Sequence, residues 1–282
     1  MTKQTLLFLM TEQTTDAELR QIADHAATQS SRIVCLLLSK MPTQPMNAYG
    51  ALPYGGFEIS DQWVEELGQS RERLKAHVDR LEALLQSQGI SGEVQVVLSG
   101  QADVRSEIAR RAMVCDVAIA SAALRDAEGA IFNDAAYSVL FESPIPLMLN
   151  ATPMKTPTRI FVAWDTQLPA ARAIHAALPL LVQAEEVILG SFDPTATEHA
   201  DGEDPGADLA KWLSHHGCKV TLTQYSSGGD RIGVAIQKRA AEVGADLIVM
   251  GAFGKSRLRE RVFGGTTRTM IDQAGMAVFL AH

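Results

Sequence analysis

Two stretches of the chain, 131 positions apart, share one pattern of apolar and polar residues. IFNDAAYSVLFESPIPLML, residues 131–149, aligns without a gap with VFGGTTRTMIDQAGMAVFL, residues 262–280. The segments before them also match: DVAIASAALRD resembles DLIVMGAFGKS, and TLLFLMT near the start resembles RIFVAWD. An internal repeat of this kind indicates two copies of one structural unit. We therefore predict two domains, residues 1–150 and 151–282, joined near NATPMKTPT, where Pro and Thr suit a linker.

Each copy alternates strand-like with helix-like segments. In the second copy we expect strands near 160–164, 187–191, 220–224, 247–250 and 277–280, and helices near 169–183, 208–216, 232–243 and 267–273. Near-continuous apolar strands with helical crossovers are typical of a parallel sheet covered on both faces. The predicted fold class is α/β, with two tandem doubly wound domains, each a five-stranded parallel sheet with helices on both faces. The first copy adds a longer helical segment over residues 60–89.

Composition narrows the classes of protein that remain. The chain has 282 residues, 46% of them hydrophobic, and a net charge of −8, which argues against general nucleic-acid or membrane-surface binding. No apolar run approaches the roughly 18 residues of a membrane span, and MTKQTLLFLMTEQTT reads as a buried first strand without a cleavage site. Cys35, Cys115 and Cys218 have no paired spacing. We therefore expect a reduced, cytoplasmic protein without disulfides or a zinc site.

The glycines near the end of the chain predict a binding site. Gly251 and Gly254 follow the fourth strand of the second copy, and Gly264 and Gly265 precede its last helix. Ligands of such sheets bind outside the carboxyl ends of the strands, and glycines let the backbone approach a phosphate closely. Free N–H groups at the start of the last helix favour an anion. The interpretation is a polyphosphate clamp; the alternative is that these glycines serve only turns.

Two better-known phosphate motifs do not fit. GKS at residues 254–256 suggests a P-loop, but the glycine that this motif needs five positions before Gly254 is replaced by Val249. The pair Gly251 and Gly254 also lacks the closely spaced third glycine of a dinucleotide fingerprint.

The pattern Gly251, two residues, Gly254, nine residues, Gly264 resembles the ATP-binding branch of the universal stress protein family. Both halves share the strand and helix order of this family, but only the second half carries the motif. The resemblance implies that Asp165 contacts the ribose, that Ala163 and Trp164 line the adenine pocket, and that the glycine segments meet the phosphates. Gly265 stands where the family usually has Ser or Thr, although Thr266 and Thr267 offer other hydroxyls. The implied nucleotide-binding residues are Ala163, Trp164, Asp165, Met250, Gly251, Phe253, Gly254, Gly264, Gly265, Thr266 and Thr267.

Simpler interpretations stand beside these assignments. Asp165 could cap the following helix, and Trp164 could belong to the core. The basic run Lys255, Arg257, Arg259 and Arg261 could be merely solvated. The histidines show no metal pattern, and no nucleophile with an adjacent base is evident, so we predict no catalytic residue.

The first copy lacks the motif. Ser121 and Leu124 replace Gly251 and Gly254, Asn133 and Asp134 replace the later glycine pair, and Thr11 replaces Asp165. A carboxylate at a phosphate position repels an anion. Residues 1–150 carry a net charge of −7 and residues 151–282 a net charge of −1. We expect the first copy to bind no nucleotide.

The sequence thus predicts a cytosolic stress-response regulatory protein that binds ATP or a related adenine nucleotide, with or without magnesium. The alternatives are a slow ATPase and a nucleotide-free protein-interaction module. We expect no nucleic-acid or membrane partner.

The two copies are expected to meet through their last strands. Single-domain relatives in the family dimerise through this edge strand, and an unpaired apolar edge is an aggregation hazard. We predict that residues 145–149 and 276–280 pair antiparallel as an intrachain pseudo-dimer, with a further homodimer as an open alternative. Because Pro146 cannot donate a ladder hydrogen bond, the pairing should be short or leave Pro146 facing outward. The nucleotide site is expected to lie away from this seam.

Overall fold

The computed structural model describes residues 3–42, 60–99, 104–127, 130–151, 155–194, 204–253 and 265–282. The strands are β1 (Thr5–Met10), β2 (Arg32–Lys40), β3 (Gly92–Ser99), β4 (Val117–Ala120), β5 (Leu147–Leu149), β6 (Arg159–Trp164), β7 (Glu186–Phe192), β8 (Val220–Tyr225), β9 (Leu247–Gly251) and β10 (Ala277–Ala281). The helices are α1 (Asp16–Thr28), α2 (Asp61–Ser87), α3 (Val104–Ala112), α4 (Ala122–Arg125), α5 (Ile131–Glu142), α6 (Leu168–Gln183), α7 (Ala207–His215), α8 (Ile232–Glu242) and α9 (Gly265–Asp272).

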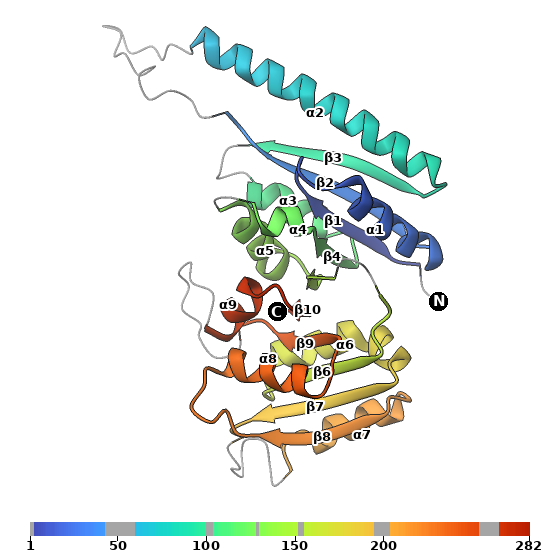
Figure 1. Ribbon diagram of the computed structural model, residues 1–282, viewed down its shortest axis with the longest axis vertical. Coiled ribbons are helices and arrows are strands. Elements are labelled where there is room, and N and C mark those ends of the chain that lie inside the picture. Colours follow the sequence, from blue (N-terminus) through green and yellow to red (C-terminus); the bar gives the residue numbers. More distant parts are fainter. Residues whose placement is uncertain are drawn as a thin grey trace, which may run out of the picture.

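All of these strands belong to a single 10-stranded sheet in the order β3-β2-β1-β4-β5-β10-β9-β6-β7-β8 (Figure 1). Neighbouring strands are parallel within each half of the chain. The first half therefore has the order 3-2-1-4-5, and the second half repeats it from the other end of the sheet. The predicted α/β class with a mostly parallel sheet is confirmed, and the two five-stranded sheets prove to be continuous.

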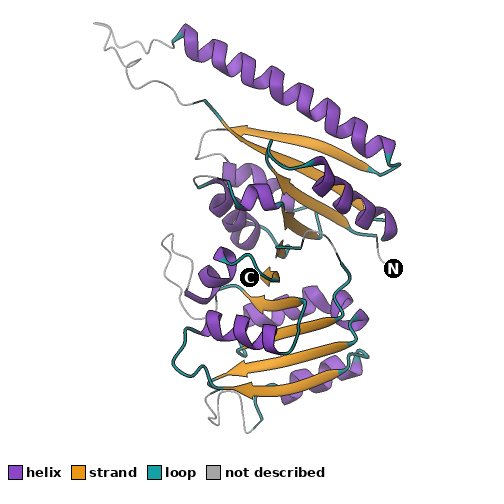
Figure 2. Ribbon diagram, viewed as in Figure 1, coloured by secondary structure: helices purple, strands orange, loops and turns teal. Residues whose placement is uncertain are grey.

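Helices cover both faces of the sheet (Figure 2). One apolar layer joins the strands to α3, α4, α5, α8 and α9, and the other joins them to α1, α2, α6 and α7. Successive strand residues alternate between these layers, as Phe161 and Val162 of β6 do, and both are fully buried. Burial on both faces explains why inner strands such as β1, β6 and β9 are almost entirely apolar, whereas the edge strands β3 and β8 contain polar residues.

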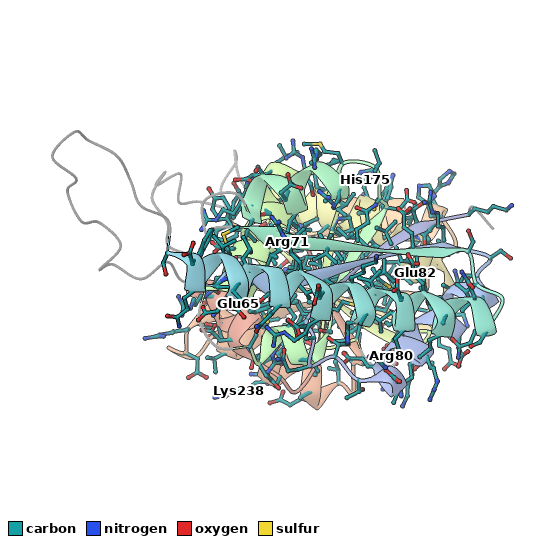
Figure 3. The ribbon with its side chains drawn as sticks, turned by 90° about the horizontal axis from the view of Figure 1, so that it is seen from above. Glu65, Arg71, Arg80, Glu82, His175 and Lys238 are labelled. Atoms are coloured by element: carbon teal, nitrogen blue, oxygen red, sulfur yellow. The ribbon has the colours of Figure 1, made fainter. Side chains whose placement is uncertain are left out.

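The segment predicted to be a long helix is α2, and it lies over the β3 edge of the sheet (Figure 1). Leu74, Leu81 and Leu85 form its buried stripe. Its outward side carries charged residues such as Glu65 and Arg71, which Figure 3 shows along the helix. The amphipathic helix thus covers one end of the sheet.

The seam between the halves is the antiparallel pairing of β5 with β10. Val278, Phe279 and Leu280 lie opposite Leu149, Met148 and Leu147. The predicted antiparallel pairing of the last strands is confirmed, and it is short, beginning directly after Pro146. The Pro146 carbonyl still accepts a hydrogen bond from the Ala118 amide at 2.9 Å.

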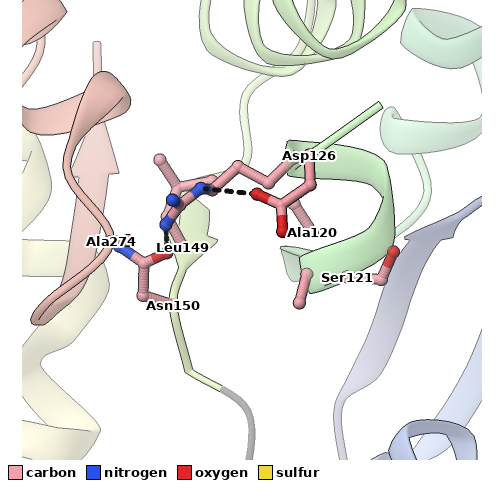
Figure 4. A pocket seen from close by; sticks show the side chains of 8 residues that line it. Ala120, Ser121, Asp126, Leu149, Asn150 and Ala274 are labelled. Atoms are coloured by element: carbon pink, nitrogen blue, oxygen red, sulfur yellow. Dashed lines mark hydrogen bonds and ion pairs between the residues drawn. The ribbon is translucent and has the colours of Figure 1, made fainter. Parts of the chain in front are cut away.

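A group of polar contacts closes one end of this seam. Asn150, at φ 55°, donates from Nδ2 to the carbonyls of Gln273 at 2.8 Å and Met276 at 3.0 Å. Its Oδ1 accepts from Arg125, which also donates to the Gln273 carbonyl at 3.0 Å. A cavity of about 200 Å³ lies beside Arg125 and Asn150 (Figure 4). None of the residues predicted to bind nucleotide lines this cavity.

Candidate functional site

The predicted site lies where β6 and β9 are neighbours. β6 continues to β7 on one side, whereas β9 pairs with β6 on the other, so the strand order reverses between β6 and β9. Ala163 pairs with Met250 in this register. Asp165 and the Gly251–Phe253 segment therefore leave the sheet side by side, at the carboxyl edge where doubly wound sheets bind ligands.

Gly251 packs against the start of α6. A Cβ atom on Gly251 would lie 2.4 Å from the Ala170 nitrogen and 2.6 Å from the Pro169 carbonyl carbon. Both neighbours are backbone atoms, so no side-chain rotation can relieve the contact. Gly251 therefore has a packing role that neither the clamp nor the turn interpretation included. Met250 before it is 5% exposed, so it can offer a ligand little beyond its backbone.

The next residues are tied to two neighbouring segments. The Ala252 amide donates to the Ala281 carbonyl at 2.7 Å, and the Ala252 carbonyl lies 2.9 Å from His282 Nδ1. The Phe253 amide donates to Thr267 Oγ1 at 3.1 Å. Thr267 is 2% exposed, so this hydroxyl joins the end of β9 to α9 inside the protein.

The first turn of α9 holds the most accessible part of the predicted clamp. Gly265 is exposed, and a Cβ atom there would meet no atom of the described residues within 4 Å. Thr266 is half-buried. The backbone N–H groups of a helical first turn lack intrahelical partners and favour anions. Gly265 and Thr266 are therefore available to a ligand, while the Thr267 hydroxyl already accepts the Phe253 amide.

Asp165 is exposed and organises the turn that leads from β6 into α6. Its Oδ1 accepts the Gln167 amide at 3.0 Å, and Gln167 is the N-cap residue of α6. Thr166 between them has φ 59°. The carboxylate thus stabilises the start of a helix and also lies at the open edge of the sheet, so the two predicted roles are compatible.

Ala163 and Trp164 do not share a face of the sheet. Ala163 is buried in the layer of α8 and α9, whereas the half-buried Trp164 packs in the layer of α6 and α7. Trp164 is therefore partly a core residue, as the alternative proposed. The two side chains cannot line one side of an adenine ring together.

Sequence reasoning missed two polar residues at the end of β7. Ser191, which pairs with Trp164, is 3% exposed, and its Oγ has no hydrogen-bond partner in the described parts of the chain. Asp193 is held by Ser227, and these hydrogen bonds lower its pKa. The sequence signal that could have identified Ser191 is a polar residue at the end of an otherwise apolar strand.

The remaining predicted residues fall outside the described part of the chain. These are Gly254 and Gly264, together with the basic residues Lys255, Arg257, Arg259 and Arg261.

One expectation about the site is wrong. We expected it to lie away from the seam, but the Phe253 ring lies 4.3 Å, centroid to centroid, from the ring of Phe141 in α5. Phe141 belongs to the first half of the chain. The strand order explains this, because β9 is separated from the seam only by β10.

The equivalent edge of the first half is occupied by the protein's own groups. The pairing of Leu9 with Ala120 corresponds to that of Ala163 with Met250, which places Ser121 at the position of Gly251. Ser121 Oγ accepts the Leu124 amide at 3.0 Å and lies 3.0 Å from Thr14 Oγ1. The Ala122 amide donates to Glu18 Oε1 at 2.7 Å. The equivalent Ala252 amide of the second half instead donates to the Ala281 carbonyl, so the first half differs by placing a carboxylate, which repels an anion, at this edge.

Asp134, at the position of Gly265, is also engaged within the protein. Its Oδ1 lies 2.7 Å from Arg105 Nε and 2.6 Å from Arg105 Nη2. Asp134 is 6% exposed. This buried, paired carboxylate stands where the second half has an open glycine.

The structure adds two observations on classes of site. In the described ranges, no three His, Cys, Asp or Glu side chains are grouped as a metal ion would require. Among the described helices, none is both long and apolar enough to cross a membrane.

Comparison with known proteins decides the family of the second half. The sequence model of the universal stress protein family matches residues 157–282. Residues 157–282 are a universal stress protein domain. A comparison with curated proteins finds no significant match to the chain.

Solved structures show that the universal stress protein fold extends over the whole chain. A universal stress protein from Archaeoglobus fulgidus DSM 4304 has 16% identity and a TM-score of 0.66, with 98% of this chain and 95% of that chain covered. A functionally unknown protein from Pseudomonas aeruginosa PAO1 has 14% identity and a TM-score of 0.59, covering 99% and 92%. At these identities the similarity concerns the fold alone.

Proposed function

We propose that this chain is a cytoplasmic stress-response regulatory protein that binds ATP or a related adenine nucleotide in residues 151–282, its second universal stress protein unit. The observation that carries the proposal is the convergence of three segments at the β6–β9 switch point. Asp165 and the end of β9 lie side by side, and Thr267 ties the start of α9 to Phe253. An exposed carboxylate and an open helix start thus border one edge of the sheet.

These groups suit the parts of a nucleotide. The Asp165 carboxylate can accept hydrogen bonds from ribose hydroxyls, and the N–H groups of Gly265 and Thr266 can donate to phosphate oxygens. Ser191 Oγ, buried without a partner in the described residues, is a further group that a ligand could satisfy. In this proposal nucleotide binding is itself the regulatory signal. The site serves to recognise the nucleotide, and we assign no catalytic residue to it.

The proposal confines nucleotide binding to one half of the chain. In residues 1–150 the Glu18 carboxylate lies at the corresponding edge, Ser121 accepts the Leu124 amide, and the Asp134–Arg105 pair occupies the helix start. Introducing a triphosphate there would require these contacts to break. The division of the chain near residue 150 into a binding and a non-binding unit is part of the proposal.

Gly265→Asp tests this function with a clean change of charge. The added side chain has room, since no atom in the described parts of the chain lies within 4 Å of the position of its Cβ. A carboxylate in the first turn also favours the α9 helix, so the fold should survive. A negative charge within about 4 Å of a phosphate costs about 1–4 kcal/mol, and we expect ATP affinity measured by calorimetry to fall at least about fivefold.

Gly265→Asn is the matched control, because it adds a side chain of the same size without the charge. We expect its ATP affinity to stay within about threefold of the wild type. Equal ATP affinity in the wild type and Gly265→Asp would remove α9 from the site, and absence of ATP binding by the wild type would refute the proposed function.

A further inference from the structure

Phe253 holds a backbone conformation that a phenylalanine seldom adopts. Its φ is 63°, in the left-handed region that favours glycine and is strained for an aromatic residue. Such conformations persist only where surrounding contacts enforce them, and they gather at functional sites. Phe253 is also the last described residue before the predicted glycine segment 254–264. Its conformation therefore sets the course of the backbone at the end of β9, beside the end of β6 and Asp165.

One contact that holds this conformation comes from Thr267. The Phe253 amide donates to Thr267 Oγ1 at 3.1 Å, and Thr267 is 2% exposed, so water does not compete for the bond. Immediately before it, the backbone of Ala252 is held by the Ala281 carbonyl and by His282 Nδ1. The end of β9 is thus fixed on two sides, and Thr267 holds the one turn that is strained.

The Phe253 side chain is held by the other half of the chain. Its ring lies 4.3 Å from that of Phe141, which lies 4.7 Å from the rings of Tyr137 and His282. The Arg105 guanidinium lies 4.5 Å above the Tyr137 ring. Aromatic pairs at such distances favour defined ring orientations. The strained residue is therefore seated on α5 across the seam.

We propose that Thr267 is a positioning residue of the nucleotide site: its buried hydroxyl, together with the Phe141 ring of the first half, fixes the predicted binding residue Phe253 in its left-handed conformation at the end of β9. This inference rests on the proposed function and assigns Thr267 a different role from direct phosphate binding. It also makes nucleotide affinity in the second half depend on a side chain of the first half.

The test compares Thr267→Val with Thr267→Ser in the full-length chain. Valine has nearly the shape of threonine but leaves the Phe253 amide without its acceptor, whereas serine keeps the hydroxyl. We expect Thr267→Val to weaken ATP binding about tenfold in calorimetry, and Thr267→Ser to bind within about threefold of the wild type. In the nucleotide-free protein, hydrogen exchange at the Phe253 amide should accelerate in Thr267→Val alone.

Phe253→Gly separates positioning from direct contact. Glycine adopts positive φ without strain, so in this background Thr267→Val should cost much less ATP affinity than it does in the wild type. An equal loss in both backgrounds would mean that the hydroxyl contacts the ligand, and would overturn the inference.

Phe141→Ala tests the contact across the seam, because Phe141 lies outside the predicted site. We expect it to weaken ATP binding severalfold, with Phe141→Leu intermediate. Wild-type affinity in Thr267→Val or in Phe141→Ala would overturn the inference while leaving the proposed function intact. A wild-type protein that binds no nucleotide would overturn both.

Discussion

The same substitution at two predicted site glycines should have opposite effects. Gly251→Ala places a methyl group 2.4 Å, 2.6 Å and 2.9 Å from backbone atoms of Pro169 and Ala170. Ordinary carbon contacts lie near 3.5–4.0 Å, so the overlap is about 1 Å and involves atoms that cannot rotate away. The start of α6 must shift from the sheet. We expect the free energy of unfolding to fall by about 3 kcal/mol, at the upper end of overpacking costs.

Gly265→Ala is the control, because its Cβ meets no atom of the residues that the structure describes within 4 Å. Alanine in a helix is favoured over glycine by about 1 kcal/mol, so this variant should be as stable as the wild type or slightly more stable. Urea denaturation followed by circular dichroism measures both. If the free energy of unfolding of Gly251→Ala lies within about 0.5 kcal/mol of the wild type, which is about the error of such measurements, the β9–α6 packing argument is wrong.

Three further predictions concern the seam, the histidines and the cysteines. Asn150→Ala should lower the free energy of unfolding by about 1–3 kcal/mol, because the seam hydrogen bonds of Asn150 are lost. Asn150→Gly should lower it by less, because glycine adopts the φ of 55° at this position without strain. A smaller loss in Asn150→Ala than in Asn150→Gly would contradict this. Burial lowers the pKa of His25, so below about pH 6.5 the unfolded chain takes up a proton more readily than the folded protein. The free energy of unfolding should therefore fall as the pH drops below that value. Urea titrations at several pH values should show a smaller fall in His25→Gln. Burial raises the pKa of Cys35 to about 12 and that of Cys115 to about 11, so at pH 8 both thiols should resist Ellman's reagent in the native protein and react in denaturant; native labelling would argue against their burial.

The sequence predicted the fold well because the elements carry strong local patterns. The strands of the second half lie within a few residues of their expected bounds, as β9 at Leu247–Gly251 shows. The internal repeat also predicted the antiparallel seam, since an apolar last strand needs a partner. The predicted pairing of the last strands, observed between β5 and β10, joins the two sheets into one.

The candidate site was predictable in position but less so in the role of each residue. Spacing cannot distinguish a glycine that packs against α6, as Gly251 does, from one with open space, as Gly265 has. The left-handed Phe253 was also hidden, because the residue type disfavours that conformation and only tertiary contacts enforce it. Ser191 escaped because its missing hydrogen-bond partner is a property of the folded environment.

The stoichiometry of ATP binding tests the central claim most directly. Calorimetric titration of the full-length chain should give one ATP per chain, with the site abolished or strongly weakened in Gly265→Asp and retained in Gly265→Asn. One site is expected because the Glu18 carboxylate, Ser121 and the Asp134–Arg105 pair occupy the equivalent edge in the first half. Two equivalent tight sites, or no binding at all, would contradict the account.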